Sequence, residues 1–531
     1  MRLGMLFLLM LFTLVTVVSA QNAPQGTGEL TLTPIGTYPQ GDIADLFDEG
    51  NAEIVAYHAP SFRLFVVNAN TATIDILDIT DPTMPILVTA VSFDEYGDGI
   101  NSVAVYDDLV AVAVEGDDVN VRGSVVFISI NGDFLHMVEV GFLPDMVVFS
   151  PDGQYVLTAN EGEPNDDYSI DPEGSVSIIY IGDNAQLATV AEATFTDFNV
   201  GGARANELPA GVRIYGPNAT VAQDLEPEYI AISADSTTAY VTLQENNAVA
   251  VIDIQTATVT AILALGYKDF SLAGNGLDAG KDDGMINIAN WNIRGLYLPD
   301  AIAYYRTDMG SYLVTANEGD SRDYDGYSEE AEINDLNLDP EIFPNAEELL
   351  ADSAIGGLEV TNALGDEDGD GDYEAVYIGG ARSFSIWDAT TGELVFDSGD
   401  QFEQIIAALY PADFNTNNDE NEFDSRSDNA GPEPEAVTLG VIGDKTYAFI
   451  GLERIGGVMV YDITNPMSPV FVTYANNRDF AGDPEAGTAK DLGPEGVLFI
   501  PADQSPNGEN LLVVANEISG TTTVYRITRN M

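Results

Sequence analysis

The sequence predicts an all-β fold, a seven-bladed β-propeller with long loop insertions, and three observations lead to this prediction. One sequence pattern recurs seven times. It consists of an acid, a short apolar strand, a turn, a second strand and a final Asn-Glu or a variant of it. Repeats of about 40 residues that are rich in short strands are typical of propellers. The last repeat ends near Ile527 without a fourth strand, whereas residues 30–36 form an extra strand before the first repeat. We therefore expect this N-terminal strand to complete the last blade and to close the ring.

The seven copies follow the pattern with different fidelity. The two clearest copies run from Pro144-Asp145 to Asn160-Glu161 and from Pro299-Asp300 to Asn317-Glu318. Looser copies run from Pro227-Glu228 to Gln244-Glu245, from Pro434-Glu435 to Leu452-Glu453 and from Pro494-Glu495 to Asn516-Glu517. Degenerate copies from Glu53 to Asn70 and from Asn101 to Glu115 come first. The fifth copy is interrupted after Glu318, and we expect it to resume at residues 375–378 and 383–387.

The chain divides into a signal peptide, residues 1–20, and one propeller domain, residues 21–531. Arg2, the apolar run at residues 6–18 and the small residue Ala20 are typical of a cleaved secretory signal. A retained membrane anchor is the alternative, but the apolar run is short for a span. Because seven blades need only about 300 residues, we expect insertions at about 183–225, 265–298, 320–375, 398–432 and 475–493, with helices only at 345–350 and 401–409.

The composition excludes several function classes. The formal net charge of −69 disfavours nucleic acid and anionic lipid as partners and attracts cations. With no cysteine in the chain, disulfides, thiolate catalysis and thiolate metal sites are excluded. Solubility, or adaptation to a salty medium, would explain much of the charge, but not the recurrence of acids at fixed places in a repeat.

The repeat predicts two rings of acids on one face. Because the first two strands of a repeat are antiparallel, the start of the first lies beside the end of the second. We expect the strand starts to surround the mouth of the central channel: Glu53, Asn101, Asp145, Glu228, Asp300, Glu435 and Glu495. The strand ends would lie close outside them: Asn70, Glu115, Glu161, Glu245, Glu318, Glu453 and Glu517.

Carboxylates this close cannot all stay ionised without protons or a cation. Hard oxygen ligands without nearby His or Cys favour Ca²⁺, with Mg²⁺ or another divalent cation as the alternative. The predicted metal ligands of the rings are Asp145, Glu161, Glu228, Glu245, Asp300, Glu318, Glu435, Glu453, Glu495 and Glu517. The structural alternative is that these acids bind backbone amides of the neighbouring blade and so hold adjacent blades together.

A second cation signal lies in the fifth repeat's insertion. Asp366, Asp368 and Asp370 have the 1, 3, 5 spacing of a calcium loop, with Gly371 at position six. Position twelve is Tyr377 rather than Glu, so the segment is not an EF-hand; a solvated acidic loop is the alternative.

Arginines are scarce, and Arg322, Arg382, Arg426 and Arg454 adjoin the acidic face. They either pair with its acids or, for Arg322, Arg426 and Arg454, bind a phosphate or another oxyanion. No G-x-S-x-G elbow and no H-E-x-x-H motif is present, and structural roles are expected for His58 and His136. The catalytic residues, if any, therefore remain unknown.

Six segments of the chain resemble the choice-of-anchor I family: residues 143–153, 313–322, 380–387, 423–428, 431–436 and 450–454. That family is similar to mesenchyme-specific cell-surface glycoproteins associated with biomineral, and some members are described as alkaline phosphatases. The resemblance implies a secreted or surface-attached β-propeller and is consistent with calcium. Since the chain ends just after its last strand, we expect free secretion rather than surface attachment.

These observations together predict an exported protein, extracellular or periplasmic, that binds Ca²⁺ on one face and interacts with mineral or another extracellular partner. A metal-dependent phosphatase or phosphodiesterase is the first alternative, in which cations held by the acids activate a water molecule. A scaffold that binds a protein or a glycan is the second. We expect no nucleic-acid partner and no membrane span after signal cleavage.

Overall fold

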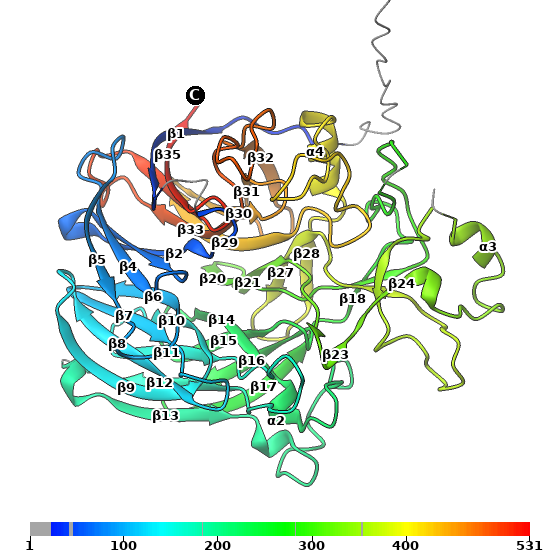
Figure 1. Cartoon of the computed structure of the whole chain (residues 1–531), viewed down its shortest axis with the longest axis horizontal. Helices are drawn as coiled ribbons and strands as arrows, with labels where there is room; N and C mark the ends of the chain where they lie inside the picture. The colour runs from blue at the N-terminus through cyan, green and yellow to red at the C-terminus, as the bar shows by residue number, and fades with distance from the viewer. Residues whose placement is uncertain (1–22, 42–45, 183, 282, 352–353, 531) are drawn as a thin grey trace, which may run out of the picture.

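The chain is built from β-sheets, and residues 23–41, 46–182, 184–281, 283–351 and 354–530 are described in a computed structural model. The predicted signal peptide lies outside these residues. Seven of the sheets have four strands each, and Figure 1 shows them arranged around a common centre. Within each of the seven sheets, neighbouring strands are antiparallel. None of the helices in the described ranges has the length and the apolar character needed to cross a membrane.

The strands of the first four sheets follow one another along the chain. They are β2 (Asn51–His58), β3 (Arg63–Asn68), β4 (Thr73–Asp78) and β5 (Ile86–Ser92); β6 (Ile100–Tyr106), β7 (Leu109–Val114), β8 (Arg122–Ser129) and β9 (Phe134–Phe142); β10 (Pro144–Phe149), β11 (Tyr155–Asn160), β12 (Ser175–Tyr180) and β13 (Thr189–Thr194); and β14 (Pro227–Ile232), β15 (Thr238–Leu243), β16 (Ala248–Asp253) and β17 (Thr258–Ala264).

The other three sheets complete the set. They are β20 (Ile302–Thr307), β21 (Gly310–Asn317), β27 (Ser383–Asp388) and β28 (Leu394–Asp397); β29 (Pro434–Ile442), β30 (Lys445–Leu452), β31 (Val458–Asp462) and β32 (Val470–Ala475); and β33 (Pro494–Ile500), β34 (Asn510–Asn516) and β35 (Thr521–Arg529) with the N-terminal β1 (Leu30–Pro39).

The first strands of the seven sheets contact one another in cyclic order. Strand β2 contacts β6, and the series continues through β10, β14, β20, β29 and β33, which in turn contacts β2. A separate apolar core fills the space between each pair of neighbouring sheets. Between the first and second sheets, for example, Phe65 and Ile76 pack with Val110 and Val112, all fully buried. Burial of apolar surface therefore stabilises the packing of each sheet against its neighbours.

The N-terminal segment joins the sheet made by the end of the chain. Strand β1 is antiparallel to β35, with Leu30 opposite Arg529 and Pro39 opposite Thr521. Glu29, next to β1, accepts hydrogen bonds from Lys445 in the preceding sheet and from Arg529. The last sheet thus takes its outermost strand from residues nearly 500 positions away in sequence.

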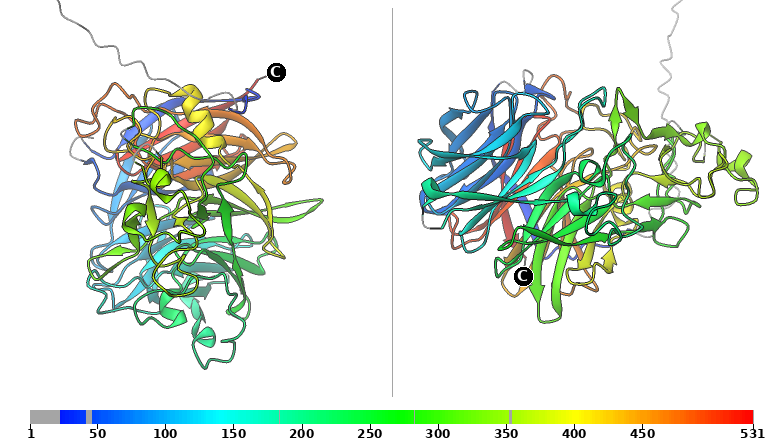
Figure 2. Two further views of the ribbon diagram at one scale, coloured as in Figure 1. Left: turned by 90° about the vertical axis from the view of Figure 1, so that its right-hand side faces the viewer. Right: turned by 90° about the horizontal axis from the view of Figure 1, so that it is seen from below.

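The long insertions lie together on one side of the sheets (Figures 1 and 2). They contain the small sheet β18 (Tyr267–Asp269), β19 (Arg294–Leu296) and β26 (Tyr377–Ile378), and the hairpins β22 (Asp323–Tyr324)–β23 (Tyr327–Ser328) and β24 (Glu330–Glu332)–β25 (Glu359–Thr361). Their helices are α2 (Val221–Asp224), α3 (Ala346–Leu349) and α4 (Gln401–Leu409), and they contain 3-10 turns at Ala185–Leu187, Thr196–Phe198 and Ile333–Asp335. A further 3-10 turn, Ala59–Ser61, connects β2 to β3.

One predicted strand lies in a different sheet. Residues 375–378 were expected to return to the fifth repeat, but β26 pairs in parallel with β19, outside the fifth four-stranded sheet. That sheet resumes only at β27, which pairs with β21. The two predicted helices are confirmed by α3 and α4, and the apolar face of α4, including Phe402 and Ile406, packs against the fifth and sixth sheets.

Candidate metal centre

A local irregularity at the start of the first strand directs an acid toward the centre. In the third sheet Pro144 is opposite Asn160, but Met146 is opposite Ala159, so Asp145 is an extra residue in the ladder. The same shift surrounds Glu495, between Pro494 and Gly496. Shifts also occur at the positions of Asn101, Glu228 and Glu435. A β-bulge of this kind changes the direction of a side chain, which explains why an acid follows the proline in the third, fourth, sixth and seventh repeats.

The asparagine of the Asn-Glu pair has a structural role. Asn160 is fully buried, and its Nδ2 donates to Ser175 Oγ at 3.2 Å and to Ser177 Oγ at 3.0 Å. Asn317 makes the equivalent bonds to Ser383 and Ser385. These bonds fix the end of the second strand, so the glutamate that follows leaves the sheet at a defined point.

The acids gather around a cavity of about 230 Å³ at the centre of the sheets. Its polar lining consists mainly of predicted site residues: Asn101, Asp145, Glu161, Glu228, Asp300, Glu318, Glu435 and Glu495, together with Gln244 and Asp320. No Lys, Arg or His is among the described residues that line it. Glu53 is not part of the lining, but it lies against Glu495.

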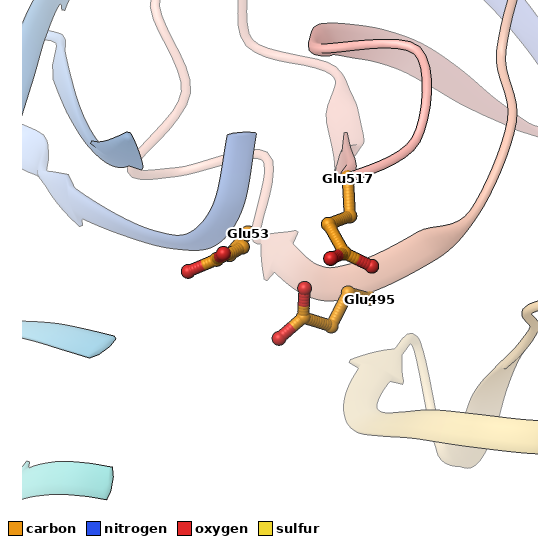
Figure 3. A group of neighbouring side chains, drawn as sticks. All are labelled: Glu53, Glu495 and Glu517. Atoms are coloured by element: carbon orange, nitrogen blue, oxygen red, sulfur yellow. The ribbon is translucent and has the colours of Figure 1, made fainter. Parts of the chain in front are cut away.

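Side chains from neighbouring sheets meet in groups of three. In four of these triads one carboxylate oxygen of each residue lies within 4.8 Å of the others: Glu53–Glu495–Glu517, Glu161–Glu228–Glu245, Asp300–Glu318–Glu435 and Glu318–Glu433–Glu453. Figure 3 shows the first triad, in which Glu53 comes from the first sheet and the other two from the last sheet. Each triad therefore bridges two adjacent sheets.

These carboxyl groups hold protons far above their ordinary pH range. Burial, reinforced by the charges of Glu163 and Glu115, raises the pKa of Asp145 to about 7. Burial and then Asp145 raise the pKa of Asp300 to about 8. Burial also raises the pKa values of Glu161, Glu228, Glu318, Glu435 and Glu495 well above 4.5, with neighbouring carboxylates adding to the effect. A positive charge placed among these groups would reverse the shifts.

Several carboxylate oxygens lack a hydrogen-bond partner. Buried Oε2 atoms of Glu228, Glu245, Glu435, Glu453 and Glu495 have none. The predicted alternative was that the acids bind backbone amides of the neighbouring blade. The contact that the structure shows between Glu318 and the fourth sheet comes instead from a side chain: Gln244 Nε2 donates to Glu318 Oε2 at 2.8 Å. A buried acceptor without a donor is costly, so these unpartnered oxygens are the ones that a proton, a water molecule or a cation would satisfy.

The predicted oxyanion-binding arginines are all paired with carboxylates. Arg322, only 2% exposed, contacts Asp224 at 2.5 Å and Glu226 at 2.7 Å. Arg426 and Arg454 both contact Glu433, and Arg454 also contacts Glu453 Oε1 at 2.8 Å. The fourth arginine of this group, Arg382, is paired with Glu403 at 2.6 Å.

The acidic loop of the fifth repeat lies away from the cavity, in the insertion after β21. Asp366 accepts hydrogen bonds from the backbone N–H groups of Gly369 and Gly371, which gives a tight turn, and Asp368 accepts one from Asp370. A neighbouring acidic group is formed by Asp339, Asp372 and Glu374, whose oxygens lie within 4.8 Å of one another. The sequence spacing did not reveal this second group, because Asp339 is distant along the chain.

The register corrects two members of the predicted outer ring. Asn51 is opposite Asn68, as Pro144 is opposite Asn160, so Ala69 rather than Asn70 takes the position of Glu161, and Asn70 is exposed. In the fourth sheet Pro227 is opposite Leu243, which places Gln244 at the position of Glu161 and Glu245 one residue beyond it.

Glu115 occupies its expected position, but it lines a separate cleft of about 750 Å³ together with Glu163 and Tyr324.

The repeat analysis missed Asp320, which lines the cavity, and two further acids close to the site. Glu226 and Glu433 precede the prolines of the fourth and sixth repeats, in the phrase Glu-Pro-Glu. Each contacts an arginine, whereas the acid after the proline lines the cavity. The glutamate before the proline of Glu-Pro-Glu was the sequence signal from which these two residues could have been predicted.

Comparisons with known proteins give one family. A model described as "Choice-of-anchor I domain" matches residues 53–466. Gigasin-3a of Magallana gigas is 30% identical over 187 residues, which cover 33% of this chain and 66% of that protein. The mesenchyme-specific cell surface glycoprotein of Strongylocentrotus purpuratus is 29% identical over 285 residues, 47% of this chain and 36% of that protein. The matched part is less than two thirds of the length of either relative.

Two solved structures align with most of this chain at low structural and sequence similarity. Kuenenia stuttgartiensis hydrazine synthase covers 91% of this chain and 97% of its own, with 13% identity and a TM-score of 0.46. The Cps50 (Swd1) β-propeller domain of Myceliophteria thermophila covers 94% of this chain and 100% of its own, with 8% identity and a TM-score of 0.44.

Proposed function

This chain belongs to the choice-of-anchor I family, and from that premise we propose that it is an extracellular seven-bladed β-propeller that binds calcium at an acidic channel mouth. The seven four-stranded sheets are the blades in this proposal. The cyclic contacts of their first strands and the pairing of β1 with β35 support a closed ring. The N-terminal strand also gives the last blade four strands like the others and covers the edge of β35.

One observation carries the calcium proposal: carboxylates from neighbouring sheets converge on a cavity that no described basic side chain lines. Burial gives these acids raised pKa values, and several of their oxygens lack a donor. A divalent cation supplies both the missing charge and the missing partner. Calcium is favoured over magnesium because it accepts six to eight oxygen ligands in flexible geometry.

The extracellular location rests on different support. One relative is named a cell surface glycoprotein, and the N-terminal residues have the composition of a secretory signal. A charge of −69 also suits a surface that attracts Ca²⁺ from solution, and we include calcium mineral or another extracellular ligand among its partners on that ground.

Calcium titration of the purified protein tests the proposal. We expect heat of binding by calorimetry, and a rise of the melting temperature when Ca²⁺ replaces chelator, because a ligand that binds only the folded state stabilises it. Mg²⁺ at the same concentration should give a smaller rise. No heat and no shift at millimolar Ca²⁺ would refute calcium binding.

The phosphatase alternative has weaker support, because each of its three candidate arginines already contacts a carboxylate. Assays with an aryl phosphate and a phosphodiester, with Ca²⁺ or chelator, decide between the two functions. Calcium-dependent turnover that Glu318→Gln abolishes would replace binding by hydrolysis as the proposed function.

A further inference from the structure

The acidic triads are of two kinds. In Glu318–Glu433–Glu453, arginines contact two of the three members, and they lower the pKa of Glu433 against the effect of burial. Among the ion pairs of the described residues, none involves the other three triads: Glu53–Glu495–Glu517, Glu161–Glu228–Glu245 and Asp300–Glu318–Glu435. The protein thus supplies its own cations at one junction and none at the others.

The triad of Glu161, Glu228 and Glu245 is the most enclosed of the arginine-free group. Glu161 is 8% exposed and Glu245 is 6% exposed. The Oε2 atoms of Glu228 and Glu245 are buried without a hydrogen-bond partner. Two unpartnered oxygens therefore lie at a point where three carboxylates approach within 4.8 Å of one another.

The surrounding residues hold this triad in place without neutralising it. Arg213 Nη1 donates to the backbone oxygen of Glu245 at 2.8 Å, while Arg213 Nη2 pairs with Glu329. Arg322 is bound to Asp224 and Glu226. Among the described residues, no ion pair joins either arginine to a carboxylate of the triad. The backbone is anchored and the carboxylates remain available.

We propose that Glu161, Glu228 and Glu245 form a divalent-cation site, with Ca²⁺ as its ligand, that joins the third sheet to the fourth. Glu161 follows β11 of the third sheet, and the other two residues belong to β14 and to the segment after β15 of the fourth. A cation bound by all three therefore links neighbouring sheets at the channel. This inference rests on the proposed function and specifies where one ion binds and what it stabilises.

The proposal predicts that one substitution has opposite effects on the melting temperature without calcium and on the rise that calcium produces. Without the cation, three buried carboxyl groups of like charge destabilise the fold. Glu245→Gln, which keeps the shape and removes the charge, should then raise the melting temperature in chelator. The same variant should lose part of the rise that Ca²⁺ produces in the wild type. A glutamate with a purely structural role would lower the melting temperature under both conditions.

The experiment compares wild type, Glu245→Gln and the control Glu347→Gln, in which the same change is made at an exposed position of α3. Calcium stoichiometry is measured by calorimetry, and melting is followed in EGTA and in millimolar Ca²⁺. We expect Glu245→Gln to bind one ion fewer, and the control to match wild type. Calcium removal should increase amide exchange at residues 160–162 and 226–229 in the wild type more than in Glu245→Gln.

The outcomes separate the two proposals. If wild type binds no calcium, both fail. If wild type binds calcium and Glu245→Gln keeps the full stoichiometry and the full shift, this site is refuted while calcium binding elsewhere stands. If Glu245→Gln does not fold, Glu228→Gln in the same triad replaces it, and retention of every ion by that variant refutes the site equally.

Discussion

Acidification should stabilise the calcium-free protein, which is the reverse of the usual behaviour of an acidic protein that depends on ion pairs. The relevant groups have folded-state pKa values raised by burial: about 7 for Glu245 and about 8 for Glu453, against 4.5 in the unfolded chain. The folded state therefore binds more protons than the unfolded state between about pH 5 and pH 8. Stability is highest below the unfolded pKa and is lost as the pH rises through the folded pKa.

The magnitude follows from the two most enclosed of these groups. Between pH 8 and pH 6, a pKa of about 7 contributes about 1 kcal/mol and a pKa of about 8 contributes about 2 kcal/mol to the free energy of unfolding. With an unfolding entropy of about 2.1 cal/mol/K per residue, a chain of this length gains roughly 1 °C for each kcal/mol. Glu245 and Glu453 alone thus predict a rise of about 3 °C, and Asp300 adds to it.

The assay is thermal melting in EGTA at pH 8, 7 and 6, repeated with saturating Ca²⁺. Bound calcium keeps the carboxylates ionised, so the melting temperature should depend less on pH in its presence, and the calcium-induced rise should be largest at pH 8. Glu433 and Glu329, whose pKa values are lowered, change charge only below about pH 5 and do not interfere. A calcium-free protein that melts lower at pH 6 than at pH 8 would refute the reasoning.

Three further predictions concern the parts around the site. Arg322→Met leaves Asp224 and Glu226 as buried unpaired charges, so we expect a loss of about 3–5 kcal/mol, seen as a lower melting temperature with unchanged calcium stoichiometry; an unchanged melting temperature would contradict it. Deletion of residues 23–39 exposes the edge of β35, and light scattering should detect association, whereas a monodisperse monomer would count against ring closure by β1. Asp368→Asn should remove one bound ion if the acidic loop is a calcium site; an unchanged ion count would leave that loop as a solvated turn.

Much of the fold could be predicted because each repeat carries its own local signals. The prolines and the turn residues mark the strand starts, so the third repeat, predicted from Pro144-Asp145 to Asn160-Glu161, coincides with β10 and β11. The N-terminal strand was predictable because the last repeat visibly lacks a fourth strand. By contrast, residues 375–378 have the composition of a repeat strand but pair with β19, a contact that only the folding of two insertions creates.

The site could be predicted as a set of acids but not as a set of triads. Which acids meet depends on the register of each sheet, and a one-residue displacement, as at Gln244 and Glu245, changes which side chain reaches the neighbour. The arginine partners were open at the sequence level because Arg322 and Asp224 are almost 100 residues apart, in separate insertions. Charge pairing across insertions has no periodicity from which it could be read.

The Glu-Pro-Glu phrase explains how one face can contain both neutralised and free acids. Proline removes a backbone donor and fixes φ, so the residues before and after it leave the strand in different directions at the bulge. In the sixth repeat Glu433, on one side of Pro434, reaches two arginines, and Glu435, on the other side, lines the cavity. Arginine pairing satisfies the first carboxylate permanently, whereas the Oε2 atom of the second has no protein partner. The proposed calcium site depends on this separation, because an arginine within reach of Glu435 would compete with the ion for the same oxygens.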